Sequence, residues 1–438
     1  MKTTKPLFLA LVVLLSLTIF NACNKKEGVD MKITLQTSAR DILTDLSGNA
    51  ADSILKEAFR VTDSVYAVDS GDYLNQFEKV WKQSFAEENL AFRFFPLLQE
   101  KISQTSSNDE VMAVIRTEYK DAISKTAEVL KKRLDDYDIY DFEVKLSDTV
   151  GLITLQLEGV KDTARVMQVI QTRGRLEFWE TYEYRNVQTY FDEADAILKA
   201  MFKPATGAKS KDTTLLADTD IQTDSLSEGV AENEQPEQKK YSTEHPLYAK
   251  LKMALVNDGS GKYSPAAGPV VGNCKIKDTA RVNYLLSLKA VTNAFPRDAR
   301  FVWTVVPTTD DKKMLQLIVL KSTRDNSPSL SWTSVVDASS KVGDDGIAQV
   351  LISMNEEGTR IWKRMTQENV GLSIAIMIDG HVYTFPTVMD QIPDGKSSIT
   401  GNFTEEQTID LAAILKAGMM PLSVRVVSVS VTTVDAGK

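Results

Sequence analysis

Residues 141–180 read "DFEVKLSDTVGLITLQLEGVKDTARVMQVIQTRGRLEFWE", and they decide which fold class the sequence predicts. Apolar and polar residues alternate over 142–146 and 152–157, which indicates two strands. Asp162 is a typical N-cap for a helix that follows the second strand, and residues 175–180 indicate a third strand. This stretch therefore predicts the order strand, strand, helix, strand.

The residues before this stretch supply a further strand and a long helix, which complete a known order of secondary-structure elements. Residues 30–37, "DMKITLQT", alternate like a strand, and residues 38–106 contain helical patches. Ser107 and Glu110 form a capping box that opens a long helix, whose apolar residues recur every three or four positions. Strand, helix, strand, strand, helix, strand is the ferredoxin-like order, with both helices on one face of the sheet. We therefore expect residues 30–200 to form an α+β, ferredoxin-like subdomain that carries a helical insertion.

A change of composition follows this subdomain. Residues 204–245 are rich in Asp, Glu, Ser and Thr and contain almost no aromatic or branched apolar residues. Such a segment cannot bury enough apolar surface to offset the entropy cost of ordering its backbone. We expect a disordered acidic linker here.

The six residues "KDTARV" occur twice, beginning at Lys161 and at Lys277, and each copy leads to a strand that ends in Trp. Asp162 and Asp278 both suit the N-cap of a helix. We expect residues 246–325 to form a second α+β segment. The repeated residues indicate either a duplication of the first unit or a chance identity at two helix starts, and the sequence leaves both open.

The clearest local signals lie in residues 326–428. Asp379-Gly380 lies between two alternating runs, which is typical of a type I′ β-hairpin. Thr404 and Gln407 form a second capping box. The run "LSVRVVSVSV" closes this segment as an alternating strand, so we expect a second α+β subdomain with an antiparallel sheet.

The charge balance argues against nucleic acid as a partner. The chain has 438 residues, a formal net charge of −9 and a sequence pI near 5.1. Proteins that bind nucleic acid neutralise phosphates with a basic surface, which this composition does not supply. The length is sufficient for two or three modest hydrophobic cores.

The first residues indicate an export signal. An apolar run from Leu7 to Phe20 follows Lys2 and Lys5. At 1.5 Å per residue this run spans about 21 Å, which is short of the roughly 30 Å hydrocarbon core of a bilayer. We therefore expect residues 1–22 to be a cleaved signal peptide and the mature chain to be exported.

Ala22-Cys23 resembles the cleavage site of bacterial lipoproteins, although Phe20 and Asn21 depart from the usual Leu and small residue. The resemblance implies that Cys23 is lipidated and anchors the chain to a membrane. Cys274 is the only other cysteine and would then have no partner, so we expect no internal disulfide. The alternative is an uncleaved short anchor with an ordinary cysteine.

Residues with catalytic or ligand chemistry are few. His245 and His381 are the two histidines, and neither has Cys, His or carboxylate neighbours at metal-ligand spacing. "GSGKY" at 259–263 lacks the earlier glycine and the hydroxyl residue of a phosphate-binding loop. "DDG" at 344–346 lacks the spaced ligands of a calcium loop and indicates a turn. We therefore expect no catalytic residue, no metal, no cofactor and no enzymatic activity.

The predicted elements carry or adjoin four tryptophans, Trp179, Trp303, Trp332 and Trp362. Core packing is the expected role for each of them. The alternative is that some line a groove for a peptide, where aromatic and Met side chains make sequence-tolerant contacts. The sequence does not separate these roles, so it identifies no polypeptide-binding residue.

Five motifs follow one another in the last third of the chain: "NEEG" at 355–358, "ENVG" at 368–371, "IDGHVY" at 378–383, "ITGNFT" at 399–404 and "LKAGMMP" at 415–421. In this order they resemble the head region of the first periplasmic domain of SecD, an accessory subunit of the bacterial protein translocase. "VLKKRL", "FEVKL" and "GRLEFWE" similarly resemble the base subdomain of that family. Together these similarities cover most of residues 30–428.

The resemblance implies a SecD-like base over residues 30–200 and a head region with its closing strand over 326–428. It also implies a protein on the periplasmic side of the cell envelope whose partner is unfolded or translocating secretory polypeptide. We expect it to bind this polypeptide as an accessory to Sec-dependent export, either beside the Sec translocase or independently of it.

The departures from the family are informative. SecD proteins begin with a spanning helix and a G-L-D-L-x-G-G motif, whereas "GVDMKITL" keeps only Gly28 and Asp30 of these features. Family members continue into further spanning helices that couple proton flow to movement, while this sequence ends at Lys438. We therefore expect polypeptide binding without a proton-driven motor, with a lipid at Cys23 in place of the helix. The sequence leaves open which membrane holds that lipid.

Two other interpretations stay open at this point. One is a structural or adaptor envelope lipoprotein whose SecD-like domain docks a different, folded protein partner. The other is a hydrolase that depends on His381.

Overall fold

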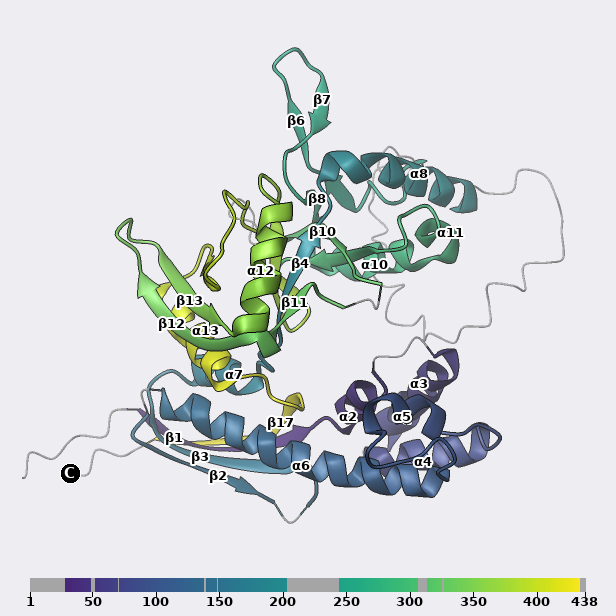
Figure 1. The fold of residues 1–438 in the computed structure, drawn as a ribbon, viewed down its shortest axis with the longest axis vertical. Coiled ribbons are helices and arrows are strands. Elements are labelled where there is room, and N and C mark those ends of the chain that lie inside the picture. The colour runs from purple at the N-terminus through teal and green to yellow at the C-terminus, as the bar shows by residue number, and fades with distance from the viewer. Residues whose placement is uncertain are drawn as a thin grey trace, which may run out of the picture. The chain divides into compact units, whose positions relative to one another are not determined.

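The computed structural model describes residues 28–48, 52–69, 71–137, 139–147, 149–202, 244–305, 313–324 and 327–433. The chain divides into two compact units, which we call unit 1 (Met1–Arg173 and Met420–Lys438) and unit 2 (Gly174–Met419). Each unit combines helices with antiparallel sheet, as the sequence predicts (Figure 1). The predicted signal peptide, Cys23 and all but the last two residues of the predicted linker lie outside the described residues.

Unit 1 is built on a four-stranded antiparallel sheet in the order β17-β1-β3-β2. Its strands are β1 (Val29–Thr37), β2 (Asp141–Leu146), β3 (Leu152–Val160) and β17 (Val424–Thr433). Two helices contact this sheet, α6 (Asn108–Asp135) and α7 (Thr163–Gln171) (Figure 1). This is the ferredoxin-like arrangement, so that part of the prediction is confirmed.

The fourth strand of this arrangement differs from the prediction. The strand expected there, β4 (Leu176–Thr181), belongs to unit 2, and the C-terminal strand β17 takes its place beside β1. The pairing of β1 with β17 runs from Val29–Thr433 to Thr37–Val424. Nearly every side chain of β4 is buried, which suits a strand in the middle of a covered sheet. The predicted boundaries are therefore wrong at two places: residues 174–200, predicted in the first subdomain, lie in unit 2, and the closing strand, predicted with residues 326–428, lies in unit 1.

The core of unit 1 follows from the alternation of apolar residues along its strands and from their three- and four-residue spacing along α6. Met31, Ile33 and Leu35 alternate along β1 and are buried against the helices. Ser107 accepts from the backbone N–H of Glu110, and the Glu110 side chain accepts from the backbone N–H of Ser107, so the predicted capping box of α6 is confirmed.

The helical insertion lies between β1 and α6. It comprises α2 (Ala39–Leu46), α3 (Ser53–Val68), α4 (Tyr73–Ser84) and α5 (Ala91–Leu98). These helices bury Leu43, Phe77, Trp81 and Phe94 in the same hydrophobic cluster as the sheet. The insertion is therefore part of the core of unit 1.

Unit 2 contains an eight-stranded sheet with the main order β15-β14-β4-β10-β8-β5 and with β9 and β11 beside β10 and β4. Apart from β4, its strands are β5 (Leu251–Met253), β8 (Val270–Lys275), β9 (Ala299–Trp303), β10 (Met314–Lys321), β11 (Leu330–Ser331), β14 (Ile374–Ile378) and β15 (His381–Thr384). The helices α8 (Tyr184–Phe202), α10 (Thr279–Ser287) and α11 (Lys289–Thr292) share a hydrophobic cluster with this sheet. Short 3₁₀ turns lie at Ile276–Asp278 and Trp332–Ser334.

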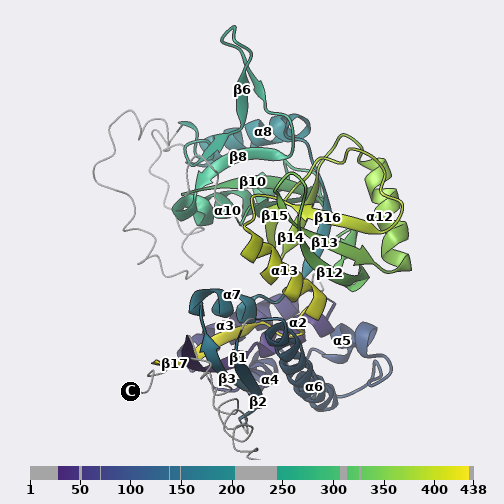
Figure 2. The ribbon, with the colours of Figure 1, turned by 90° about the vertical axis from the view of Figure 1, so that its left-hand side faces the viewer.

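Unit 2 also contains a three-stranded sheet in the order β12-β13-β16. Its strands are β12 (Val335–Val342), β13 (Ala348–Met354) and β16 (Lys396–Thr400), and its helices are α12 (Glu356–Glu368) and α13 (Glu405–Ala417). A separate hairpin of β6 (Leu255–Asn257) and β7 (Tyr263–Pro265) stands clear of the rest of unit 2 in both ribbon views (Figures 1 and 2).

The local signals of the last third are confirmed. Thr404 and Gln407 form the capping box of α13. Asp379 and Gly380 have φ values of 51° and 81°, the left-handed values that a type I′ turn requires at both central residues.

The repeated "KDTARV" residues adopt different local structures. Asp162 caps α7, because its carboxylate accepts from the backbone N–H of Arg165 at 2.9 Å. Asp278 lies at the predicted N-cap position of α10 but makes no side-chain cap bond, since a 3₁₀ turn already precedes the helix. The first copy lies in unit 1 and the second in unit 2.

In the described part of the chain, no helix combines the length and the apolar character that crossing a bilayer requires.

The side chain of Arg173 joins three segments of unit 1. Its Nε donates to the backbone oxygen of Met420 at 3.0 Å, and a terminal nitrogen donates to the backbone oxygen of Pro421 and to Asp45, both at 2.6 Å. The backbone N–H of Met420 in turn donates to the Arg173 carbonyl at 2.9 Å. Arg173 therefore fixes the point where the chain leaves unit 1 and the point where it returns.

We expect Arg173→Ala to lower the free energy of unfolding of unit 1 by about 2–4 kcal/mol, because the substitution leaves partly buried acceptors unpaired. The slowing of amide hydrogen exchange in β1 and β17 measures this quantity for unit 1 alone. Arg60→Ala is the control, because Arg60 is exposed and pairs with the exposed Glu57, so we expect amide protection close to that of the parent chain. Equal protection of the β1 and β17 amides in the Arg173→Ala and Arg60→Ala variants would contradict the role given to Arg173.

Candidate functional site

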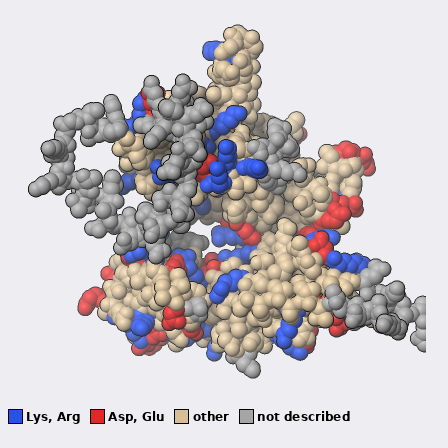
Figure 3. All heavy atoms as spheres, turned by 180° about the vertical axis from the view of Figure 1, so that it is seen from behind, with Lys and Arg blue, Asp and Glu red and all other residues tan. Residues whose placement is uncertain are grey.

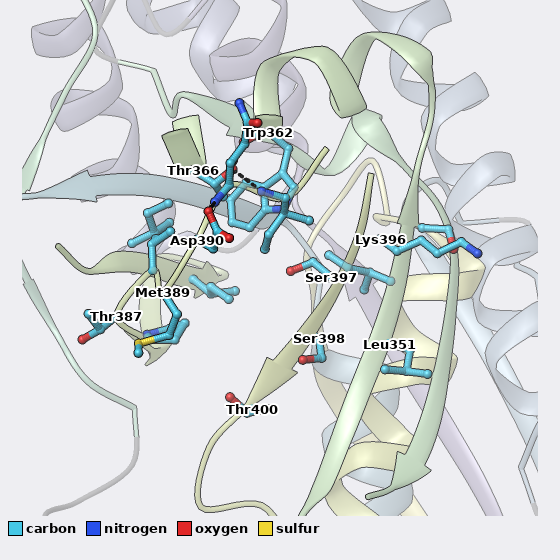
Figure 4. Close-up of a pocket in the computed structure, with 18 of the residues that line it drawn as sticks. Leu351, Trp362, Thr366, Thr387, Met389, Asp390, Lys396, Ser397, Ser398 and Thr400 are labelled. Carbon is cyan, nitrogen blue, oxygen red and sulfur yellow. Dashed lines mark hydrogen bonds between the residues drawn. The ribbon is translucent and has the colours of Figure 1, made fainter. Parts of the chain in front are cut away.

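A groove of about 780 Å³ opens on unit 2 beside strand β16, and we call it the β16 groove. Its walls come from β12, β13, α12, β14, β16 and the segment 386–392. Figure 4 shows Met389 and Thr387 on one side of the groove and Ser397, Ser398 and Thr400 on the other. The groove therefore lies entirely within unit 2, between the segment 386–392 and strand β16.

The apolar surface of the groove includes Trp362 of α12 and Ile374 and Ile376 of β14. All three side chains are buried, and the Trp362 ring packs on Phe178 with 5.1 Å between ring centroids. The indole N–H of Trp362 is enclosed but has no hydrogen-bond partner among the described residues. A buried donor without a partner costs about 1–3 kcal/mol, so Trp362 places an unsatisfied polar group in the wall of the groove.

The segment 386–392 is fixed at several points but exposes its middle. The backbone N–H of Ile392 donates to Thr366 Oγ1 at 3.0 Å, and the backbone N–H of Val388 donates to the carbonyl of Leu372 at 2.9 Å. Met389, between these anchors, is 85% exposed. A flexible, polarisable thioether at this position can adapt to side chains of different shape.

Strand β16 offers backbone groups to the groove. It pairs with β13 on one side, and on its other side no strand of the described residues pairs with it. Gly395 sets the start of β16, because its φ is +67° and an added Cβ would lie 2.0 Å from Thr359 Oγ1. A free strand edge of this kind is a site where an extended peptide can add as a further strand.

The groove contains little charge. The charged residues in its lining are Asp337, Asp390 and Lys396, and the lining contains no histidine or cysteine. The arrangement therefore combines apolar surface, hydroxyl groups and a strand edge, which suits binding of an extended, mostly apolar segment.

The two histidines lie in other surroundings. His245 Nδ1 lies 2.9 Å from Asp195 Oδ2, and the buried Asp195 also accepts from the backbone N–H of Leu247 at 2.9 Å. This pair ties the chain at residues 245–247 to helix α8. His381 is exposed, and its Nδ1 lies 3.1 Å from the carbonyl of Asp379.

The two glycine-containing loops are turns, as the sequence predicts. Residues 259–263 connect β6 to β7, and Tyr263 is the first residue of β7. Residues 344–346 lie in the connection between β12 and β13. Figure 3 shows the β6–β7 hairpin as a mostly uncharged projection, and Leu255 and Tyr263 are among its exposed side chains. Over the described residues, no group of three His, Cys, Asp or Glu side chains is placed to hold a metal ion.

The other three tryptophans and Cys274 do not line the β16 groove. Trp179 is buried and its indole N–H donates to Glu177 at 3.0 Å, while Trp303 donates to Asn283 at 2.8 Å. Trp332 is partly buried against the same cluster as Trp362. Burial raises the pKa of the Cys274 thiol to about 12, with a further contribution from Asp278, so this cysteine is kept as an unreactive thiol.

The sequence singles out one residue of the β16 groove. Trp362 is one of the four tryptophans for which the sequence leaves both a core role and a groove role open. The sequence indicates neither the exposure of Met389 nor the free edge of β16, because side-chain exposure and strand pairing depend on long-range packing. The only local signal for segment 386–392 is its mixture of Pro, Val, Met and Ile outside any regular element.

This chain is similar to SecD and SecDF proteins. Residues 305–422, which include every residue of the β16 groove, match the family model described as the P1 head subdomain of SecDF. The chain is 31% identical over 336 residues to the protein translocase subunit SecD of Rhodothermus marinus, an alignment that covers 76% of this chain and 50% of that protein. It is 42% identical over 78 residues to SecD of Desulfurispirillum indicum, covering 18% of this chain and 15% of that protein.

The chain thus spans half or less of the length of these relatives. Among solved structures, a crystal structure of SecDF in a super-membrane-facing form matches 96% of this chain and 34% of its own, with a TM-score of 0.40 and 13% identity.

We expect Trp362→Phe to lower the free energy of unfolding by about 1 kcal/mol or less, because the lost ring volume is partly offset by removal of a buried donor that has no partner. Trp179→Phe is the matched control, and we expect it to lower stability by about 1–2 kcal/mol because its indole hydrogen bond is lost. Urea unfolding of both variants makes the comparison. A larger loss for Trp362→Phe than for Trp179→Phe would contradict this account of the groove wall.

Proposed function

Because this chain carries the P1 domain of the SecD family, we propose that it serves protein export as a SecD-like accessory that binds unfolded or translocating polypeptide. The similarity to protein translocase subunits supports the export role. The β16 groove supports the binding role, and its combination of apolar wall and free strand edge is the observation on which the proposal rests.

An unfolded segment exposes the two kinds of group that the β16 groove can satisfy. Its backbone N–H and C=O groups can pair with the free edge of β16, and this pairing does not depend on sequence. Its apolar side chains can lie against Trp362, Ile376 and the exposed Met389. Both contacts tolerate variation of the bound sequence, as an export accessory requires.

The proposal places the protein in the cell envelope, on the periplasmic side, in association with the Sec translocase. The P1 domain of the family is periplasmic, which supports this location. We further propose that residues 1–22 are a signal peptide and that a lipid at Cys23 holds the chain at the membrane. In this proposal the β16 groove binds polypeptide, and the chain acts neither as a proton-driven motor nor as an enzyme.

We expect Met389→Asp to weaken binding of a permanently unfolded polypeptide about tenfold, since the loss of one buried apolar contact and the burial of a charge amount to at least about 1.4 kcal/mol. Val68→Asp is the matched control, because Val68 is 92% exposed on a helix of unit 1 and is not among the groove residues. Fluorescence anisotropy of a labelled, carboxymethylated polypeptide gives both dissociation constants.

Equal dissociation constants for the Met389→Asp and Val68→Asp variants would contradict binding in the β16 groove. A parent chain that binds no unfolded polypeptide but retrieves one stoichiometric folded partner would favour the adaptor interpretation. Crosslinking to nascent secretory chains in cells tests the export role itself, and the absence of adducts would contradict it.

We expect Cys23→Ala to abolish incorporation of a palmitate analogue and to move the chain from the membrane fraction to the soluble fraction. A variant that stays in the membrane fraction would favour the uncleaved anchor. Separation of inner from outer membrane completes this test, because outer-membrane location of the parent chain would contradict association with the translocase.

A further inference from the structure

Strand β17 forms an edge of the sheet of unit 1. It pairs with β1 along one side. Along its other side, the part of the chain that the structure describes supplies no further strand. The register with β1 skips Val427, so the regular part of the edge begins at Ser428.

The regular part of this edge lacks the features that usually prevent strand pairing. Residues 428–432 read "SVSVT" and contain no charge and no proline. Val429 and Val431 are 43% and 52% exposed. Soluble proteins usually protect such an edge with Lys, Pro or a covering element, so an uncharged edge with exposed valines is suited to pairing with another strand.

The exposed valines continue the apolar face of the sheet. Val429 lies opposite Ile33 and Val431 lies opposite Met31, and both β1 residues are buried. Residues that face each other across an antiparallel pair project to the same side of the sheet. The helix-covered face of the sheet of unit 1 therefore continues past β1 to Val429 and Val431, which are only partly buried.

We propose that β17 pairs antiparallel with β17 of a second copy of this chain, about a two-fold axis at Ser430. In this register Ser430 faces Ser430 of the second copy, each Val429 faces Val431, and each Ser428 faces Thr432. Valines then meet valines on the helix side, and hydroxyl groups meet hydroxyl groups on the other side. The strand is thus complementary to itself, as an isologous interface requires.

Charge also favours the antiparallel arrangement. Arg425 is the only charged residue of β17, and it lies at one end of the strand. Antiparallel pairing places the two copies of Arg425 at opposite ends of the joint, whereas parallel pairing in register would place them side by side. The interface joins two four-stranded sheets through their edges and uses no residue of the β16 groove.

Oxidative crosslinking of the full chain tests this register. Ser430→Cys in a Cys23→Ser background should give a disulfide-linked dimer, because residues that face each other across two strands have Cα atoms about 5 Å apart. Ser428→Cys should give at least about fivefold less dimer, since two copies of residue 428 would be about 14 Å apart. Cys274 is buried and stays in both variants.

Light scattering at about 100 µM tests the association itself, because one strand pair is smaller than a standard interface and is expected to bind weakly. Val429→Lys combined with Val431→Lys should remove the dimer, while Val65→Lys, an exposed valine of α3, and Met389→Asp should leave it unchanged. Hydrogen exchange of β1 checks that the double variant is folded.

A monomeric parent chain, or equal crosslinking at residues 428 and 430, would overturn the proposal. Crosslinks from Ser430→Cys to an added polypeptide in place of a second copy would also overturn it. Binding at the β16 groove is measured separately, so failure of either proposal is distinguishable from failure of the other.

Discussion

The pairing of β1 with β17 is the constraint on which the rest of the structure depends. β1 needs a strand on each side to complete the ferredoxin-like sheet, and the second of these strands comes from the end of the described chain. Unit 2 is therefore inserted between α7 and the last strand of unit 1. Two hydrogen bonds between Arg173 and Met420 hold the two ends of this insertion side by side. Unit 2 can thus carry the β16 groove while unit 1 keeps a complete four-stranded sheet and its own hydrophobic core.

The sequence predicts those parts of the fold that neighbouring residues determine. The capping boxes at Ser107 and Thr404 and the turn at Asp379-Gly380 each depend on a few consecutive residues, and all three are confirmed. The choice between β4 and β17 as the partner of β1 depends on pairing across most of the chain. Both strands have strand-like composition, so the choice could not be made from the sequence. The structure explains the choice, because nearly every side chain of β4 is buried, as suits a strand covered on both faces.

The candidate site was less predictable than the fold for the same physical reason. Trp362 has both of the roles between which the sequence does not decide, since it packs on Phe178 and also lines the β16 groove. Its indole N–H is an unpaired donor only because of where α12 packs, and the β16 edge is free only because of how three strands are ordered. Neither property has a local sequence signal. The predicted lipid site at Cys23 lies outside the described residues and rests on its sequence motif.

The central claim is that extended polypeptide is held in the groove beside β16. Hydrogen–deuterium exchange of the full chain, with and without a saturating unfolded polypeptide, tests this claim most directly because backbone pairing protects amides. The account predicts slower exchange in residues 396–400 and 386–392, with little change in the core helices of unit 1. Unchanged exchange in both groove segments, with protection confined to another surface, would contradict it.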